Sequence, residues 1–334
     1  MNIIAKTSAA ALLAAGALAG TVTGAAAQDV TMRIGWTTSD GEADPYAIAA
    51  RQIQAELEER APGVFDVEFF PNNQLGDEKQ MIEALQFGTL DLGIITNAPV
   101  GNVEPAFQIL DMPFLFPDEE AAHEALDGEL GDELMSRLEG SGIVGLGFAE
   151  GGFRNMINNA RPIQQPDDVE GVKFRVMQNP VFIDMFQSLG GNAVPMAWGE
   201  TFTAAQQGTI DGLEIPLAVI ASNKYADVVE YLSLTQHTYS ALDILASERF
   251  LSGLSDEQRT TVTEAVDAAI ETQRQTVQEN ADAVLAHLEE AGMTINEIED
   301  PEAFREKVKP VYDSFRDDIG SDLVDMALGQ SGSE

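Results

Sequence analysis

GGFRN at Gly151–Asn155 opens a stretch that continues with GVKFRV at Gly171–Val176, PMAWGE at Pro195–Glu200 and DGLEIP at Asp211–Pro216. Two of these segments carry an arginine in a short strand-like run, Arg154 and Arg175. Arginine is scarce in this chain, because Lys and Arg together number 18 against 56 Asp and Glu. Its planar fork can hold a carboxylate through two parallel charge-assisted hydrogen bonds. The alternative for either arginine is a weak surface ion pair with one of the many acids.

The pattern of apolar residues on either side of this stretch predicts two α/β domains. Before it, strand and helix periodicities follow one another as β-α-β-α-β, which is typical of a mostly parallel sheet. Strands are expected at residues 30–36, 67–70, 90–95 and 143–148. From Gly151 the alternation restarts and continues to Leu234, which indicates a second α/β domain. Two separate short strands are expected at Tyr231–Leu234 and Ile244–Ser247.

The segment after Leu254 predicts helix, with Ser255 and Gln258 placed as a capping box. Two apolar stripes follow at helical spacing and are interrupted near Gln273 and Arg274. One continuous helix from Asp256 to Ala291 would be about 54 Å long, at about 1.5 Å per residue. Such a helix could brace both domains. The alternative is two shorter helices broken near residue 275.

Composition excludes several classes of function. The formal net charge of −38 argues against nucleic acid and anionic membrane as partners, because both require cationic surface. Cysteine is absent, which removes thiol nucleophiles, disulfides and cysteine-ligated metals. The three histidines are far apart in sequence, which argues against a His-rich metal site and a Ser-His-Asp triad. The sequence therefore predicts that the protein is not an enzyme and that it binds no cofactor.

Residues 1–27 have the composition of a secretory signal peptide. Lys6 precedes a run rich in Ala, Leu, Gly and Val, and Ala25–Ala27 supplies small residues for cleavage before Gln28. No cysteine follows the small residues, which argues against a lipid anchor, and no later stretch has the ~20 apolar residues of a membrane span. An exported protein without stable membrane insertion is expected.

Taken together, the motifs resemble those of the DctP-type solute-binding proteins of TRAP transporters. The matching residues, in chain order, are Asn73–Gly76 (NQLG), Leu110–Leu115 (LDMPFL), Arg154, Gly171-x-Lys173-x-Arg175, Pro195-Met196-x-Trp198-x-Glu200 and Asp211-Gly212-x-Glu214-x-Pro216. The resemblance covers essentially the whole mature chain. It implies an α/β, two-domain periplasmic-binding-protein fold with a hinge, and a long C-terminal helix spanning both domains. It therefore favours the continuous helix.

The same resemblance implies a division of the chain and a set of partners. We expect domain I at residues 28–151 plus 241–280 and domain II at residues 152–240 plus 281–334, with the ligand cleft between them. The ligand would be a small organic acid, captured in the periplasm by closure of the domains. It would then be delivered to the small and large integral-membrane components of a TRAP transporter.

By position, Arg175 matches the family's carboxylate-binding arginine and Arg154 a second, less general arginine contact. Trp198 matches an aromatic residue that packs on the ligand, although core packing beside Met196 is the alternative. Polar contacts from the first domain, which vary with the ligand, would come from Glu78, Thr37 and Thr96.

Ile215 departs from the family pattern, which usually has Asn at this position. Isoleucine can neither donate nor accept a hydrogen bond, so the ligand presents an apolar or smaller group there, or another side chain replaces the contact. Glu214 beside it is expected to be a structural partner, because a carboxylate would repel an anionic ligand. The alternatives to organic-anion capture are a zwitterionic compatible solute of the ectoine type, a secreted hydrolase and a sensor-associated binding protein.

Overall fold

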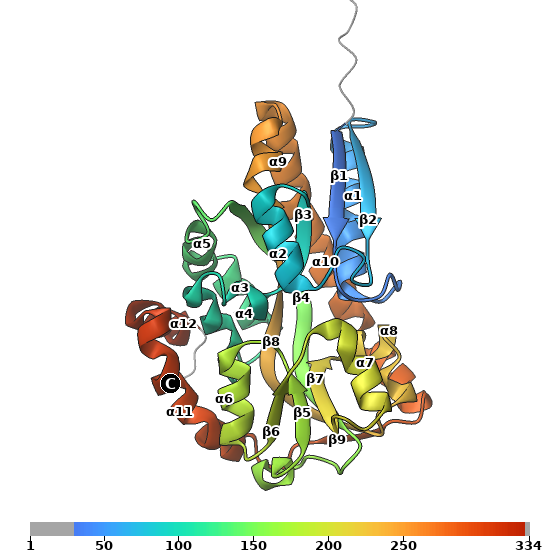
Figure 1. Ribbon diagram of the computed structural model, residues 1–334, viewed down its shortest axis with the longest axis vertical. Coiled ribbons are helices and arrows are strands. Elements are labelled where there is room, and N and C mark those ends of the chain that lie inside the picture. The colour runs from blue at the N-terminus through green and yellow to red at the C-terminus, as the bar shows by residue number, and fades with distance from the viewer. Residues whose placement is uncertain (1–29, 331–334) are drawn as a thin grey trace, which may run out of the picture.

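Two long antiparallel strands, β4 (Ile143–Asn158) and β8 (Tyr231–Ser247), run through the middle of the sheet on which the molecule is built. The computed structural model describes residues 30–330, so the expected signal peptide lies outside the described residues. Within them the sheet has nine strands in the order β2-β1-β3-β8-β4-β7-β5-β6, and β9 pairs with β8. β4 and β8 connect an upper half of the molecule to a lower half (Figure 1).

The upper half begins with the predicted β-α-β-α-β order. Its elements are β1 (Val30–Gly35), α1 (Pro45–Arg60), β2 (Phe65–Phe70), α2 (Glu78–Phe87) and β3 (Leu92–Thr96). β1 pairs in parallel with both β2 and β3, and β3 joins β8 antiparallel. Asp77 begins α2 with a full capping box to Gln80, and Gly88 ends it in the left-handed conformation. Short helices complete this half: α3 (Asn97–Val100), the 3-10 helix η1 (Pro105–Asp111), α4 (Glu119–Leu126), α5 (Glu129–Ser136) and α9 (Glu248–Gly253).

The lower half repeats the parallel arrangement with shorter strands. Its elements are η2 (Pro166–Val169), β5 (Lys173–Val176), α6 (Pro180–Ser188), β6 (Asn192–Pro195), α7 (Trp198–Gln206), β7 (Gly212–Pro216), α8 (Leu217–Ser222), η3 (Tyr225–Asp227) and β9 (Thr294–Glu297). β5 pairs in parallel with β6 and β7, and β7 joins β4 antiparallel. The motif stretch around Arg154 and Arg175 therefore forms one continuous part of the sheet.

The expected breaks inside β4 and β8 are wrong. Ile143–Phe148 and the run after Gly151 belong to one strand, and Tyr231–Leu234 and Ile244–Ser247 belong to another. Register shifts between the two strands occur at Gly145/Gly147, Glu150/Gly152 and Arg154/Met156. Gly147 has φ +142° and Gly152 has φ +93°, backbone conformations that side chains disfavour. These bulges interrupt the alternation of apolar residues without ending the strands, which explains why the sequence suggested separate elements.

A single helix, α10 (Asp256–Glu290), confirms the continuous alternative over 35 residues. Its first part packs along α1 and its second part against α8. At the interruption between the apolar stripes, Gln273 accepts from Glu150 N (2.8 Å) and donates to Glu150 O (2.7 Å). Arg274 donates to Phe148 O (2.6 Å) and pairs with Asp127 (2.6 Å). The polar interruption therefore fastens the helix to the middle of β4.

Two apolar cores lie on opposite faces of the sheet. Consecutive residues of β3, Ile94 and Ile95, belong to different cores, as do Met156 and Ile157 of β4, because successive strand residues point to opposite faces. The last helices, α11 (Pro301–Ile319) and α12 (Ser321–Gln330), pack on the core that contains α2 and α6, and α11 contacts both α6 and η1. Among residues 30–330, no helix combines the length and the apolar character that crossing a membrane requires.

Candidate ligand-binding cleft

Two adjoining cavities lie where the halves of the sheet meet. The small cavity has a volume of about 20 Å³, and the large cavity has a volume of about 430 Å³. They share four lining residues: Glu78, Arg175, Met177 and Trp198. All seven residues that the sequence singled out line the small cavity, namely Arg175, Arg154, Trp198, Ile215, Glu78, Thr37 and Thr96. The fold therefore brings the whole predicted set together.

The strand ends explain this convergence. Thr37 follows β1 and Thr96 ends β3, while Arg175 lies in β5 and Ile215 in β7. β1 and β3 run antiparallel to β5 and β7, so the carboxyl ends of the two parallel groups face each other across the middle of the sheet. Ligands bind at the carboxyl ends of strands in open α/β folds. Two helix starts add the remaining groups, because Glu78 and Trp198 are the first residues of α2 and α7.

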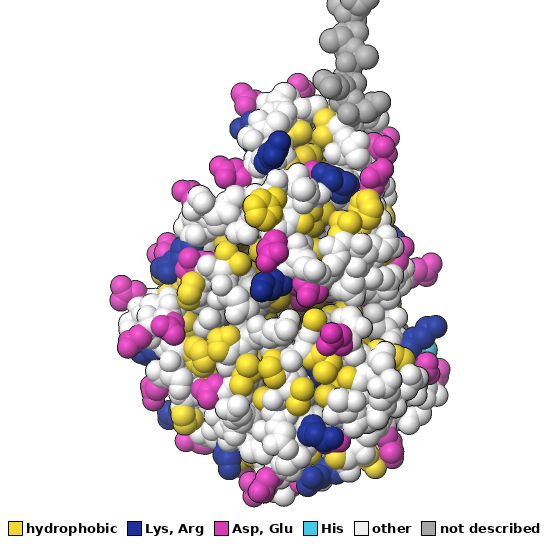
Figure 2. All heavy atoms as spheres, viewed as in Figure 1, with side chains coloured by type: hydrophobic (Ala, Val, Ile, Leu, Met, Phe, Trp, Pro, Cys, Tyr) yellow, Lys and Arg dark blue, Asp and Glu magenta, His cyan; other side chains and the backbone are white. Residues whose placement is uncertain are grey.

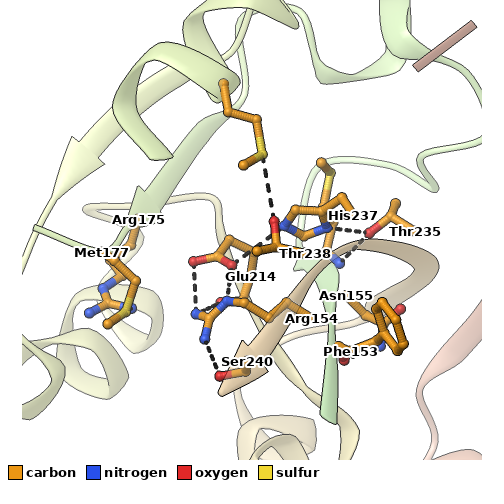
Figure 3. Close-up of polar contacts among 12 residues, drawn as sticks. Phe153, Arg154, Asn155, Arg175, Met177, Glu214, Thr235, His237, Thr238 and Ser240 are labelled. Atoms are coloured by element: carbon orange, nitrogen blue, oxygen red, sulfur yellow. Dashed lines mark hydrogen bonds and ion pairs between the residues drawn. The ribbon is translucent and has the colours of Figure 1, made fainter. Parts of the chain in front are cut away.

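Arg154 is already paired with an acid. Its Nε donates to Glu214 Oε2, and its Nη2 donates to Glu214 Oε1 (2.9 Å) and to the Glu214 carbonyl (2.7 Å). Its Nη1 donates to Ser240 Oγ (3.2 Å), and the guanidinium stacks over Phe182 at 5.3 Å. Figure 3 shows this pair between β4, β7 and β8. Of the five N–H groups of an arginine, one on Nη1 is left for a ligand.

The charges of this pair stabilise each other. Burial alone lowers the pKa of Arg154, but the Glu214 carboxylate outweighs it and the net pKa is raised. Burial raises the pKa of Glu214, yet the Arg154 charge and His237 outweigh it, so its net pKa is lowered. His237 is fully buried, and its Nε2 lies 3.5 Å from Glu214 Oε2, beyond good hydrogen-bonding contact. Burial lowers the pKa of His237, which favours the neutral ring beside the ion pair.

Within residues 30–330 Arg175 makes no ion pair, although the effect of burial on its pKa is partly offset by the nearby charges of Glu214 and Glu78. The Arg175 side chain is 2% exposed, and it donates from Nε and Nη2 to the Met196 carbonyl (2.9 and 2.7 Å). Nη1 has only the weak acceptor Met177 Sδ, at 3.5 Å. No carboxylate of the described residues forms an ion pair with it, and Figure 3 shows it apart from the Arg154–Glu214 pair. Burial is the main reason that the pKa of Arg175 is lowered, but an arginine stays charged at neutral pH.

Glu78 lies between the two cavities with one oxygen engaged. Its Oε1 accepts from Thr96 N (2.9 Å) and from the Thr96 hydroxyl. Burial raises the pKa of the Glu78 carboxyl, although Thr96 and the two arginines partly offset this. Within residues 30–330, Oε2 makes no hydrogen bond, so it is the oxygen available to a ligand at the junction of the cavities.

Trp198 and Ile215 form the apolar part of the small cavity. Trp198 is half-buried, and its ring centroid lies 5.6 Å from that of Tyr225, so it both packs on the core and lines the cavity. Ile215 is 2% exposed and sits opposite Asn155 in the β4–β7 ladder. The Asn155 side chain instead donates to the Phe153 carbonyl (3.1 Å) and accepts from Gln236 N (3.2 Å). Asn155 does not line the small cavity, so it does not replace the missing polar group there.

Sequence reasoning missed several lining residues. They include Thr38, Tyr46, Met177, Asn102 and Gln178. Met177 follows the Arg175 strand directly, so its place could have been anticipated from the end of β5. Thr38 and Gln178 directly follow Thr37 and Met177, so they could have been anticipated in the same way. Tyr46 and Asn102 lie on segments that reach the cavities only through the tertiary fold.

Hydrogen bonds between the halves border the cleft on both sides. On one side, Asp44 accepts from Ser222 Oγ (2.8 Å) and Asn223 Nδ2 (3.2 Å) at the end of α8. On the other side, Asn179 Nδ2 donates to the Ala98 carbonyl (2.9 Å) and to Asp111 Oδ2 (3.0 Å). The structure therefore has the halves in contact around the cavities.

The fold and this cleft define a two-domain periplasmic binding protein. A family model described as bacterial extracellular solute-binding protein, family 7 (DctP) matches residues 37–318. The chain therefore belongs to the DctP family, the solute-binding proteins of TRAP transporters.

Two solved structures and one characterised relative are closely similar. A TRAP periplasmic solute-binding protein from Polaromonas sp. JS666, bound to D-erythronate, is 36% identical with a TM-score of 0.86, over 90% of this chain and 98% of that one. The sugar-acid-binding protein DctPAm of Advenella mimigardefordensis, in complex with galactonate, is 33% identical with a TM-score of 0.88, over 91% and 98%. The 2,3-diketo-L-gulonate-binding periplasmic protein YiaO of Escherichia coli is 34% identical over 94% of this chain and 95% of that one.

Proposed function

We propose that this protein captures a small hydroxylated carboxylic acid, of the sugar-acid type, in the periplasm. The observation that carries the proposal is Arg175, a buried cation at the junction of the two cavities without an acid partner among the described residues. A buried charge is costly unless it is paired, so a ligand carboxylate is the partner that this site lacks. The relatives that hold erythronate, galactonate and diketogulonate support the same chemistry.

The carboxylate would bind the free N–H groups of Arg175, with Trp198 as an apolar wall. The small cavity, at about 20 Å³, has room for about one water molecule. A four- to six-carbon acid therefore extends into the large cavity, or the halves separate further to admit it. Glu78, Asn102 and Gln178 line the large cavity and offer hydrogen bonds to hydroxyl groups.

Closure would couple binding to transport. The two domains would be residues 28–151 plus 241–280 and residues 152–240 plus 281–334, bending where β4 and β8 are bulged. A ligand stabilises the closed state only as far as it binds that state better than the open one. The closed, loaded protein would then dock on the small and large membrane components of a TRAP transporter. A zwitterionic solute of the ectoine type has no support among the relatives above.

The test is isothermal titration calorimetry on protein unfolded and refolded to remove any co-purified ligand. Erythronate, galactonate and glucuronate are titrated against wild type and Arg175→Lys, which keeps the charge and loses the planar fork. We expect saturable binding of at least one acid by wild type, and affinity at least 30-fold weaker in the variant. Equal affinity in both proteins would refute the role of Arg175. Conversion of the acid to a new product, followed by NMR, would instead support the hydrolase alternative.

A further inference from the structure

The cationic side chains that line the two cavities differ in whether an acid pairs with them. Three cationic side chains line the cavities, Arg154, Arg175 and Lys79, among the residues that the structure describes. Glu214 neutralises Arg154 through a bidentate contact inside the protein. Arg175 is therefore the one unmatched buried cation of the lining in the described part of the chain. Its charge suffices for a single carboxylate.

The large cavity offers no second receptor for an anion. Lys79 lies on an exposed turn of α2 between two acids that line the same cavity, Asp77 and Glu83. Glu78 adds a fourth titratable group at the inner end. Even without Glu78, the two acids of this wall, Asp77 and Glu83, outnumber the single lysine. A second carboxylate reaching from Arg175 into this space would face excess negative charge.

We propose that the cleft selects monoanions: acids with one carboxylate, held by Arg175, whose remaining carbons carry neutral hydroxyl groups. This inference rests on the proposed function and narrows its substrate class. Aldonates and uronates satisfy it, because they carry one carboxylate. Dicarboxylates of the same chain length do not, since their second charge would be desolvated without a cation to receive it.

The experiment compares acids that differ only in the second carboxylate. D-Galactonate is paired with galactarate and D-erythronate with meso-tartrate, each titrated by calorimetry at pH 8, where every carboxylate of the ligands is ionised. We expect the monoanion of at least one pair to bind at least 100-fold tighter than its diacid, a difference of about 2.7 kcal/mol. Diacids that bind within threefold of their monoacids, or tighter, would overturn the inference while leaving carboxylate capture intact. Failure of all four acids to bind would overturn the proposed function, and the inference with it.

A charge-reversal variant tests the physical cause. Glu83→Lys changes an exposed residue of the large cavity, so its fold is expected to persist. It should strengthen diacid binding about tenfold and change monoacid binding less than threefold. Glu289→Lys, on the exposed face of α10 and outside both cavities, makes the same change in net charge and should leave both affinities unaltered. Equal effects of the two variants would show that overall charge, and not the cavity wall, sets the preference, which contradicts the proposal.

A second variant tests the inner part of the cleft. Glu214→Gln frees the Arg154 charge, so the mono-to-diacid affinity ratio should fall at least tenfold in folded protein. Because Glu214 is buried, circular dichroism is used to check that Glu214→Gln folds. If it does not fold, the Glu83→Lys variant still tests the proposal. An unchanged ratio in folded Glu214→Gln would contradict the argument from the matched pair.

Discussion

Arg154 and Arg175 lie on strands β4 and β5 on either side of β7, both buried and both lining the same small cavity. Arg154 has Glu214 against its guanidinium, whereas Arg175 has only the Met196 carbonyl and a sulfur atom. The sequence places both arginines in similar strand-like runs, and only the neighbouring acid distinguishes them. The paired arginine connects β4 to β7, and the proposed function assigns the ligand carboxylate to the unpaired one.

The acids of the cleft region show the same contrast. Glu214 has an arginine, and its net pKa is lowered, whereas burial raises the pKa of Asp111 to about 7. Asp243 on β8 is fully buried, neither of its oxygens has a hydrogen-bond partner, and burial raises its pKa well above the ordinary value. The cleft region therefore combines the buried Arg154–Glu214 ion pair with buried acids whose pKa values are raised. This contrast can be tested by changing each member in turn.

The largest effect is expected from breaking the matched pair. Arg154→Met leaves Glu214 charged and buried without its partner, which typically costs about 3–5 kcal/mol of the free energy of unfolding. Urea unfolding monitored by tryptophan fluorescence measures the loss. The double variant Arg154→Met/Glu214→Gln removes the stranded charge and should recover most of it. A double variant as unstable as the single one would show that the ion pair is not the cause.

The next effect is the pH dependence that Asp111 contributes. Its pKa rises from 3.8 to about 7 on folding, so the folded state binds more protons between these values, and stability falls as pH rises through this window. Asp111→Asn removes the cost of charging the group. The variant should match wild type near pH 4 and exceed it at pH 8 by at most about 4 kcal/mol.

Urea unfolding of both proteins at pH 4.5, 6 and 8 measures this difference. Asp313→Asn, which changes an exposed acid on α11, controls for the loss of one charge. A difference between Asp111→Asn and wild type that does not grow with pH would show that Asp111 is charged throughout.

Replacing Arg175 should change the free energy of unfolding in the opposite direction to replacing Arg154. Arg175→Met removes a buried cation that has no acid partner, and methionine fills part of its volume. The ligand-free protein should therefore gain about 1–3 kcal/mol in the free energy of unfolding, even though it loses binding. Differential scanning calorimetry of ligand-free samples provides the measurement. A variant less stable than wild type would mean that the contacts to Met196 and Met177 outweigh the cost of burying the charge.

The smallest effect concerns Ile215. Ile215→Asn introduces the polar residue usual in the family, with a smaller side chain, in the lining of the same cavity. It should change the relative affinity for two epimeric sugar acids by up to about tenfold, or 1.4 kcal/mol, because a new hydrogen-bonding group favours one hydroxyl orientation. Competition calorimetry with galactonate and gluconate measures the ratio. An unchanged ratio would place Ile215 away from the bound hydroxyl groups.

Local periodicity was enough to predict the parallel strands. The resemblance to DctP-type proteins was needed to favour the single long helix and to select the seven residues that meet in the small cavity. Neither could predict that Glu214 pairs with Arg154, because the contact depends on the register of β4 with β7, two strands that are 60 residues apart at this pair. The continuity of β4 was hidden by Gly147 and Gly152, whose bulges disturb the alternation on which strand prediction relies. The hydrogen bonds from Arg175 to the Met196 carbonyl could not be predicted either, because a backbone acceptor does not depend on the pattern of side chains.

Among residues 30–330, four segments reach from one half of the molecule to the other: β4, β8, α10 and α11. A single flexible linker would let the halves swivel, twist and slide, whereas four connected strips restrict their relative motion, and bending across the strips is the motion that we expect. Gln273 and Arg274 fasten α10 to the middle of β4, so these two strips are expected to bend together. We therefore expect opening to follow one bending motion, in which the hydrogen bonds of Asp44 and Asn179 between the halves break.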